Sequence, residues 1–439
     1  MSPVAEEKDV FRAQFERFAL DLARSDAAWL RPIRTSAIAR FAERGFPATK
    51  DEAWRGTSVA EIARTVFARP GAFAASRSAL EAAGHVALGG AEIVFVNGRL
   101  RPELSSLGAV AGLTITSLQE ALASGGERLA PHLTRIVSYE KSAFTALNTA
   151  FVEDGALLEI TGVVAAPIHL VFYSSPDGNA ATVSYPRVLV VAKSGSEATV
   201  VESHLGRGRY LSCAVTEIVV EADARLEHVK LQRESEQAFH VGAIGIAQAR
   251  ASRFVSQHFA LGGALSRTDI DTRFDGEGGE CELNGLFFAS GSQHADTHTV
   301  IDHASPRCSS RELYKGIVDG RGRGVFHGRI VVQKGAQKTD AHQTNKNLLL
   351  SREALVQSTP QLEIFADDVK CKHGSTTGQL DEAALFYLRS RGIGESEARA
   401  LLTWAFASDL VQRLRNQPLR AALQAQLGAR LPGALELPA

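Results

Sequence analysis

The chain of 439 residues contains few cysteines, and no two of them form a CxxC pair. Its four cysteines are Cys213, Cys281, Cys308 and Cys371. A disulfide framework or a self-contained zinc module requires closely spaced thiols, so this distribution argues against both. A chain of this length can bury a sizeable core without such crosslinks. Any metal site must therefore recruit other side chains.

The sequence also lacks an excess of charge of either sign, since 48 basic residues stand against 49 acidic ones. We therefore expect no nucleic acid and no membrane surface among its partners. The most apolar stretch, GVVAAPIHLVFY, contains His169 and is shorter than the roughly 20 residues of a membrane helix. The N-terminal stretch lacks the apolar segment of a signal peptide, which predicts a soluble, cytoplasmic protein.

No Gly-Lys dipeptide occurs anywhere in the chain. The phosphate-binding P-loop requires GxxxxGK[ST], so the sequence predicts that this chain binds no nucleotide. The glycine-rich stretch GRGRG at 320–324 is interpreted as a tight turn between strands.

Residues 1–155 are predicted to form an N-terminal helical domain with a small β element. Phe11, Phe15 and Phe18 follow the spacing of one buried helix face. A later stretch, IVFVNGRL, places Asn-Gly between apolar residues, which is the strongest short-range signal for a β-hairpin.

Residues 156–375 are predicted to be β-structure, because short runs rich in Val, Ile and Thr alternate with turns such as KSGSE and GEGGE. In GECELNGLFF, Cys281 and Leu283 alternate with Glu282 and Asn284, the period of a half-buried strand. Such strands suit a sandwich, a propeller or a β-solenoid. Periodicity does not choose among these folds, because no clean fixed repeat fits the segment.

Residues 376–439 return to a helical pattern, with Asp381 as the cap of a first helix and a second helix predicted from Ser396 to Arg415. The second helix carries an apolar stripe at i+4 steps, from Leu402 to Leu414.

A second apolar stripe lies beside the first and consists of Leu401, Trp404 and Val411. Two stripes exceed what one contact face requires. Burial within the domain is one interpretation. The other is a docking surface for a partner protein, with Leu401, Trp404 and Val411 as contacts.

The stretch VKCKH at 369–373 combines a thiol and an imidazole two positions apart. In an extended strand, Cys371 and His373 share one face, whereas Lys370 and Lys372 share the other. Both Cys and His are good ligands for a soft metal, yet two ligands do not complete a site. The alternative is that both residues belong to the core, with the histidine hydrogen-bonded.

The stretches GRIVVQKGAQKTDAHQTNKNLLLS, STPQLEIFADDVKCKHGSTTGQLDEAALFYLRSRGI and GFPATKDEAWRGTSVAEI closely resemble the SufD family, subunits of the SUF iron–sulfur cluster assembly complex. The resemblance implies a mainly β fold, a right-handed parallel β-helix flanked by N-terminal and C-terminal helical domains. It also implies a heterodimer with the paralogue SufB, with the ATPase SufC docked on the C-terminal helices. Whether the isolated chain forms a homodimer stays open.

The function implied by the resemblance is that of a non-catalytic scaffold subunit, on which a transient iron–sulfur cluster is built at the interface with SufB. The family's ligand histidine matches His373, and Cys371 is the second candidate ligand. Two alternatives stay open: a structural adaptor that binds no metal, and a carbohydrate-active enzyme, since β-helices often host sugar chemistry.

Overall fold

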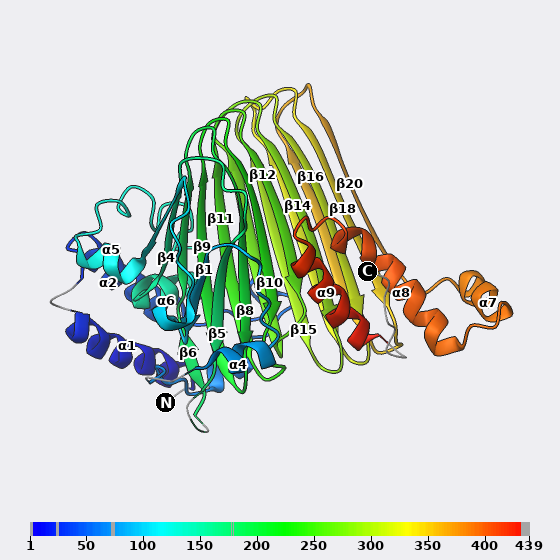
Figure 1. Ribbon diagram of the computed structural model, residues 1–439, viewed down its shortest axis with the longest axis horizontal. Helices are drawn as coiled ribbons and strands as arrows, with labels where there is room; N and C mark the ends of the chain where they lie inside the picture. Colours follow the sequence, from blue (N-terminus) through cyan, green and yellow to red (C-terminus); the bar gives the residue numbers. More distant parts are fainter. Residues whose placement is uncertain (1–2, 23–25, 72–74, 177, 179, 432–439) are drawn as a thin grey trace.

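The strands of the chain stack into a parallel β-solenoid, and helices from the N-terminal and C-terminal segments pack on its outer faces (Figure 1). The computed structural model describes residues 3–22, 26–71, 75–176, 178 and 180–431. The mainly β fold with a parallel β-helix core, which the resemblance implied, is confirmed.

Two ten-stranded sheets form the walls of the solenoid and are named here by their last strands. The β20 sheet contains, in spatial order, β2 (Arg99–Leu100), β1 (Glu92–Val96), β5 (Ile168–Ser174), β8 (Glu197–Gly206), β10 (Arg225–Arg233), β12 (Arg253–Ala260), β14 (Glu280–Ala289), β16 (Ser309–Val318), β18 (Asp340–Leu349) and β20 (Lys370–Gly378). The β19 sheet contains β19 (Leu355–Ile364), β17 (Arg323–Val332), β15 (His294–His303), β13 (Leu265–Phe274), β11 (Phe239–Gln248), β9 (Tyr210–Val220), β7 (Arg187–Ala192), β4 (Gly155–Ile160) and β3 (Leu113–Ser117), with β6 (Thr182–Ser184) paired to β9.

Side chains in register on neighbouring strands form rows that point into the solenoid. Leu226 pairs with Phe254, and Phe254 pairs with Cys281. All three side chains are buried in one apolar cluster that runs along the interior. Full burial of such a side chain contributes about 1.5–3 kcal/mol, so the stacked rows supply the main stabilising term of the fold.

The turns that lead from the β19 sheet into the β20 sheet share a local feature. The six turns from β7–β8 to β17–β18 each contain one residue with positive φ, namely Gly195, Asp223, Ala251, Gly278, Arg307 and Lys338. Glycine adopts this conformation freely, whereas a side chain with a Cβ atom makes it less favourable by about 1 kcal/mol or more. The solenoid geometry therefore imposes one left-handed residue at each of these corners.

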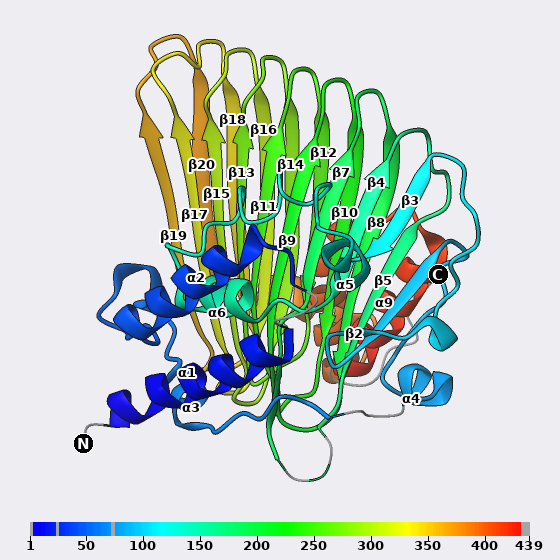
Figure 2. The ribbon, with the colours of Figure 1, turned by 90° about the vertical axis from the view of Figure 1, so that its left-hand side faces the viewer.

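The N-terminal helices cover the outer face of the β19 sheet (Figure 2). They are α1 (Pro3–Leu22), α2 (Leu30–Arg44), α3 (Ala60–Arg64), α5 (Leu118–Ala123) and α6 (Ala143–Phe151), with short 3-10 turns at Glu52–Trp54 and Pro102–Leu104. The remaining helix, α4 (Arg77–Ala82), lies against the β20 sheet, where Leu80 packs on Val94 and Val171.

The motif GFPATKDEAWRGTSVAEI joins the N-terminal helices to the solenoid. The Thr57 hydroxyl donates to Asp296 at 2.6 Å, and the same carboxylate accepts from Arg267 at 2.9 Å. The Arg267 guanidinium lies 3.8 Å from the ring centroid of Trp54. A buried carboxylate is tolerated here because a cation and a hydroxyl both satisfy it.

The predicted Asn-Gly hairpin is confirmed between β1 and β2, which pair antiparallel. However, β1 also pairs in parallel with β5, and β3 pairs with β4, so strands from the N-terminal segment extend both walls of the solenoid. The small β element is therefore part of the solenoid rather than a separate unit.

The C-terminal helices are α7 (Glu382–Ser390), α8 (Glu395–Val411) and α9 (Gln417–Arg430). The prediction placed the end of the second helix at Arg415, but α8 ends at Val411, and α9 was not predicted. Helices α8 and α9 pack on the outer face of the β20 sheet, whereas α7 projects away from the solenoid (Figure 1). In the described part of the chain, no helix has the length and apolar character needed to cross a membrane.

Candidate functional site

Strand β20 forms one wall of the open end of the solenoid, the end at which β19 and β20 are the last strands. Cys371 pairs with Ala341, and His373 pairs with Gln343. Ala341 and Gln343 are buried and belong to inward rows. The prediction that Cys371 and His373 share one face of a strand is confirmed, and that face is the inward one.

These two inward side chains differ in their surroundings, although both lie on β20, which no further turn covers in the described part of the chain. Cys371 is half-buried and packs against the interior apolar cluster. Burial raises the pKa of the Cys371 thiol, although the backbone hydrogen bond to Ala341 acts in the opposite direction. His373 is exposed at the open end.

Polar side chains hold the last two layers together beside these candidate ligands. The hydroxyls of Ser358 on β19 and Ser375 on β20 lie 2.7 Å apart, and Ser358 also donates to Asn345 at 2.8 Å. These bonds link the two sheets at the open end. These hydrogen bonds to the β19 sheet therefore restrict the movement of β20 and of any ligand residue on it.

A buried carboxylate, Glu312 on β16, lies two strands behind His373 in the same inward row. Gln343, the register partner of His373, donates to Glu312 at 2.6 Å. Burial raises the pKa of Glu312 to about 7. Sequence reasoning did not select Glu312, although alternation through Ser310, Glu312 and Tyr314 could have marked it as inward-facing.

Replacing Glu312 with glutamine is expected to remove a loss of stability that the chain otherwise shows between acid and neutral pH. The folded-state pKa of about 7 lies above the ordinary value of 4.5, so the folded chain favours the protonated carboxyl. The protonated Glu312 carboxyl contributes fully to the free energy of unfolding below the ordinary pKa. This contribution is lost as pH rises through the folded-state pKa, a decrease on the order of 3 kcal/mol. Urea unfolding at pH 5 and pH 8.5 would measure it, with exposed Glu353→Gln as the control. An equal pH dependence in wild type and Glu312→Gln would contradict the assignment.

Chain-internal ligands do not complete the site at the open end. Among the residues that the structure describes, a group of three or more clustered His, Cys, Asp or Glu ligands occurs only at His85, Glu92 and His169, on another part of the solenoid. Cys371 and His373 therefore offer two donors at an exposed end.

The predicted docking residues on α8 differ in accessibility. Val411 is 0% exposed and packs in the apolar cluster between the C-terminal helices and the β20 sheet. A partner cannot contact its side chain in this conformation, so the interpretation of Val411 as core is the correct one. Leu401 and Trp404 are half-buried, and Trp404 packs against the same cluster.

Sequence reasoning missed a second apolar surface, on α7. This helix has no buried residue, and Phe386 and Tyr387 are 75% and 57% exposed. Its N-terminus is capped as predicted, because the Asp381 carboxylate accepts from the backbone N–H of Ala383 at 2.9 Å. The run LFYL within α7 was the available signal, since four consecutive apolar residues cannot all face one side of a helix.

Comparisons with known proteins agree with this architecture. The description "SUF system FeS cluster assembly, SufBD core domain" matches residues 173–406, and "SufBD protein N-terminal region" matches residues 5–169. An iron–sulfur cluster assembly SufBD family protein of Synechocystis is 34% identical over 394 residues, covering 87% of this chain and 86% of that protein. The iron–sulfur cluster assembly protein SufD of Escherichia coli is 41% identical over 241 residues, covering 54% of this chain and 57% of that protein.

The solenoid, the helices that flank it and these matches define a protein of the SUF system for iron–sulfur cluster assembly. The chain belongs to the SufBD family, and the resemblance to SufD is confirmed.

Proposed function

We propose that this chain is a non-catalytic scaffold subunit on which a nascent iron–sulfur cluster is held at the open end of the solenoid. The observation that carries the proposal is the position of His373, an inward-row imidazole that is exposed because β20 is the last strand. The cluster is cargo for recipient proteins rather than a resident cofactor.

The ligand chemistry favours His373 over Cys371. A neutral imidazole offers a lone pair at neutral pH, whereas a thiol must lose its proton before it can bind iron. Burial raises the pKa of Cys371 and so disfavours the thiolate. His373 is therefore assigned as the principal ligand and Cys371 as a secondary one.

The remaining ligands are assigned to SufB, the paralogue that the SufD resemblance implies as partner. An exposed, unpaired strand edge is a template for pairing with another chain, and both β19 and β20 end their sheets in this chain. Large apolar side chains flank β19 at the open end, with Leu355, Ile364 and Phe365 all exposed. Exposed apolar side chains beside the candidate ligands suit an interface whose buried centre is apolar.

We expect Phe365→Glu to weaken binding to SufB by tenfold or more while leaving the fold intact. Phe365 is 59% exposed, so a charge there costs little in the free chain but would be desolvated in an interface at the open end. Co-purification with tagged SufB would measure the effect, and Val66→Glu, at an exposed N-terminal position, is the control. Unchanged binding of Phe365→Glu would place the interface elsewhere.

The ATPase SufC is assigned to the C-terminal helices. Phe386 and Tyr387 on the projecting α7 are exposed, and Leu401 and Trp404 on α8 are partly accessible. A chain without a P-loop requires a partner's ATPase if ATP drives assembly.

The proposal as a whole is tested by expressing the chain with SufB and SufC and purifying the complex without oxygen. We expect iron and acid-labile sulfide in the ternary complex and much less of both when this chain is omitted. A complex that assembles but carries no more iron and sulfide than SufB and SufC alone would favour the adaptor without metal.

A further inference from the structure

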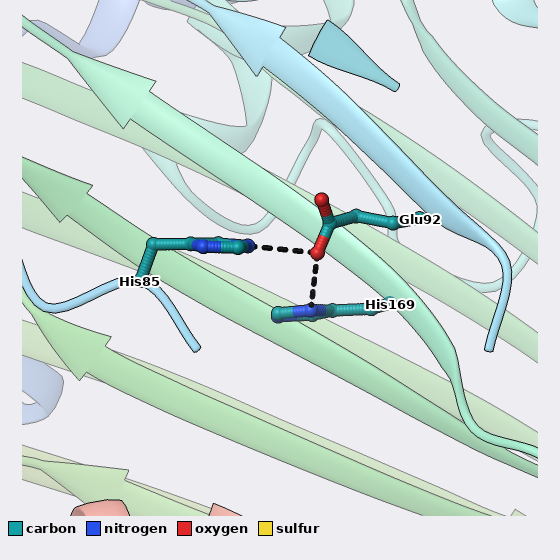
Figure 3. Close-up of side chains that lie close together, drawn as sticks. All are labelled: His85, Glu92 and His169. Carbon is teal, nitrogen blue, oxygen red and sulfur yellow. Dashed lines mark hydrogen bonds and ion pairs between the residues drawn. The ribbon is translucent and has the colours of Figure 1, made fainter. Parts of the chain in front are cut away.

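A compact group of three potential metal ligands lies on the outer face of the β20 sheet, remote in sequence from the candidate cluster ligands. Glu92 on β1 pairs in register with His169 on β5, so their side chains stand next to each other. His85 follows α4 and reaches the same carboxylate from outside the sheet (Figure 3).

The three side chains converge within the range that one metal ion spans. His85 Nε2 lies 2.7 Å from Glu92 Oε2, and His169 Nδ1 lies 3.3 Å from the same oxygen. One ligand atom from each residue lies within 4.8 Å of the others. Ligands about 2.1 Å from a tetrahedral metal ion stand roughly 3.4 Å from one another, so small side-chain movements would suffice.

Burial and partial hydrogen bonding leave one imidazole nitrogen poorly satisfied. The side chains of His85, Glu92 and His169 are only 3%, 8% and 2% exposed. His169 Nε2 lies 2.8 Å from the Ser203 hydroxyl, whereas the buried Nδ1 makes no well-aligned hydrogen bond and has only the longer contact with Glu92. A histidine ring anchored through one nitrogen presents the other to a metal ion, the usual arrangement of metal-bound histidines.

The two oxygens of the Glu92 carboxylate also have different partners. Arg77 donates to Glu92 Oε1 at 2.5 Å and to the Leu104 carbonyl at 2.7 Å. Arg77 thus orients the carboxylate through one oxygen, while both imidazoles face the other. A positive guanidinium near a cation site also lowers the affinity for a metal ion.

We propose that His85, Glu92 and His169 form a binding site for one divalent transition-metal ion of the zinc and ferrous-iron class. Two imidazoles and one carboxylate are the donor set of ferrous facial triads and of catalytic zinc sites, which keep further positions for water. Mg²⁺ and Ca²⁺ prefer all-oxygen sites and are not expected here. The site joins the segment after α4 to β1 and β5 and does not depend on the proposed cluster site.

The test uses the full chain carrying His373→Ala and Cys371→Ala, so that metal bound at the open end does not contribute. After treatment with a chelator, Zn²⁺ is titrated by calorimetry, Fe²⁺ is titrated without oxygen, and Co²⁺ is followed by its visible absorption. We expect one equivalent of Zn²⁺ or Fe²⁺ and a Co²⁺ spectrum of low-symmetry, nitrogen and oxygen coordination.

The variants His85→Gln and Glu92→Gln should each weaken binding by about 100-fold or more, since loss of even an outer partner of a ligand costs 10–100-fold. His342→Ala, at a histidine on β18, is the matched control and should bind as the parent chain does.

Thermal unfolding of each metal-free variant checks that the fold persists. Absence of a stoichiometric metal ion in the parent chain would overturn the proposal, as would unchanged affinity in both His85→Gln and Glu92→Gln. Either result would identify the three residues as a hydrogen-bonded clamp and would leave the assignment of His373 untouched. If the glutamine variants unfold, X-ray absorption at the zinc edge of the parent chain decides, and a first coordination shell without two imidazoles contradicts the site.

Discussion

Replacing His373 with alanine is expected to remove most of the iron and sulfide from the anaerobically purified complex with SufB and SufC. His373 is exposed on the last strand, so its loss creates no cavity and leaves the free chain folded. The imidazole is the principal ligand proposed for this chain, and a cluster that lacks one protein ligand is released or never forms. We expect a reduction of fivefold or more in iron and sulfide per complex.

Two further variants sharpen this measurement. Cys371→Ala should reduce cluster content less, because burial raises the pKa of the Cys371 thiol. His342→Ala removes another histidine, on the neighbouring strand β18, and should have no effect, because the inward row of His373 contains Gln343 rather than His342. Wild-type iron and sulfide in the His373→Ala complex would exclude His373 as a ligand and would favour the adaptor that binds no metal.

Replacing Phe386 and Tyr387 together with alanine is expected to abolish co-purification of SufC. The two side chains are 75% and 57% exposed on a helix that has no buried residue. Truncation of an aromatic anchor commonly costs an interface about 2 kcal/mol or more, so the pair should weaken binding by well over a hundredfold. Because neither side chain packs in the core, the thermal unfolding temperature should not change.

Leu20→Ala and Trp404→Ala are the comparison variants for the α7 pair. Leu20 is 77% exposed on α1, so its truncation should affect neither folding nor binding. Trp404 packs against the cluster beneath α8, so its truncation should destabilise the fold as well as any docking. Full retention of SufC by the α7 double variant would move the docking surface to α8, where Leu401 and Trp404 lie.

The mainly β class was predictable because strand periodicity is local, but the residue pattern alone did not select the solenoid. In-register residues on successive turns stand 28, 27, 29, 31 and 30 positions apart, from Arg225 through Arg253, Glu280, Ser309 and Asp340 to Lys370. A search for one fixed period fails on such a series. Turn length varies because the corners, unlike the strands, carry no register that must be kept.

The C-terminal segment shows the same limit in a helical context. The stripe of Leu401, Trp404 and Val411 was identified correctly as apolar, yet the sequence did not say which of its members a neighbouring element covers. Val411 faces the β20 sheet and is core, whereas Phe386, on the preceding helix α7, faces solvent. Helix periodicity fixes which residues share a face, but the partner of that face comes from elsewhere in the chain.

The sequence by itself determined that Cys371 and His373 point the same way, because side chains two apart in a strand always do. Only the tertiary structure decided that the shared face of Cys371 and His373 points into the solenoid. It also decided that β20 is the last strand, so that His373 is accessible. The tertiary structure also decided that Glu92 lies beside His169, because the register of β1 against β5 is set when the strands pair. It likewise decided that His85, which follows α4, lies close to both residues. The physical reason is the range of the interactions: backbone geometry acts between neighbours in sequence, whereas burial depends on residues far away along the chain.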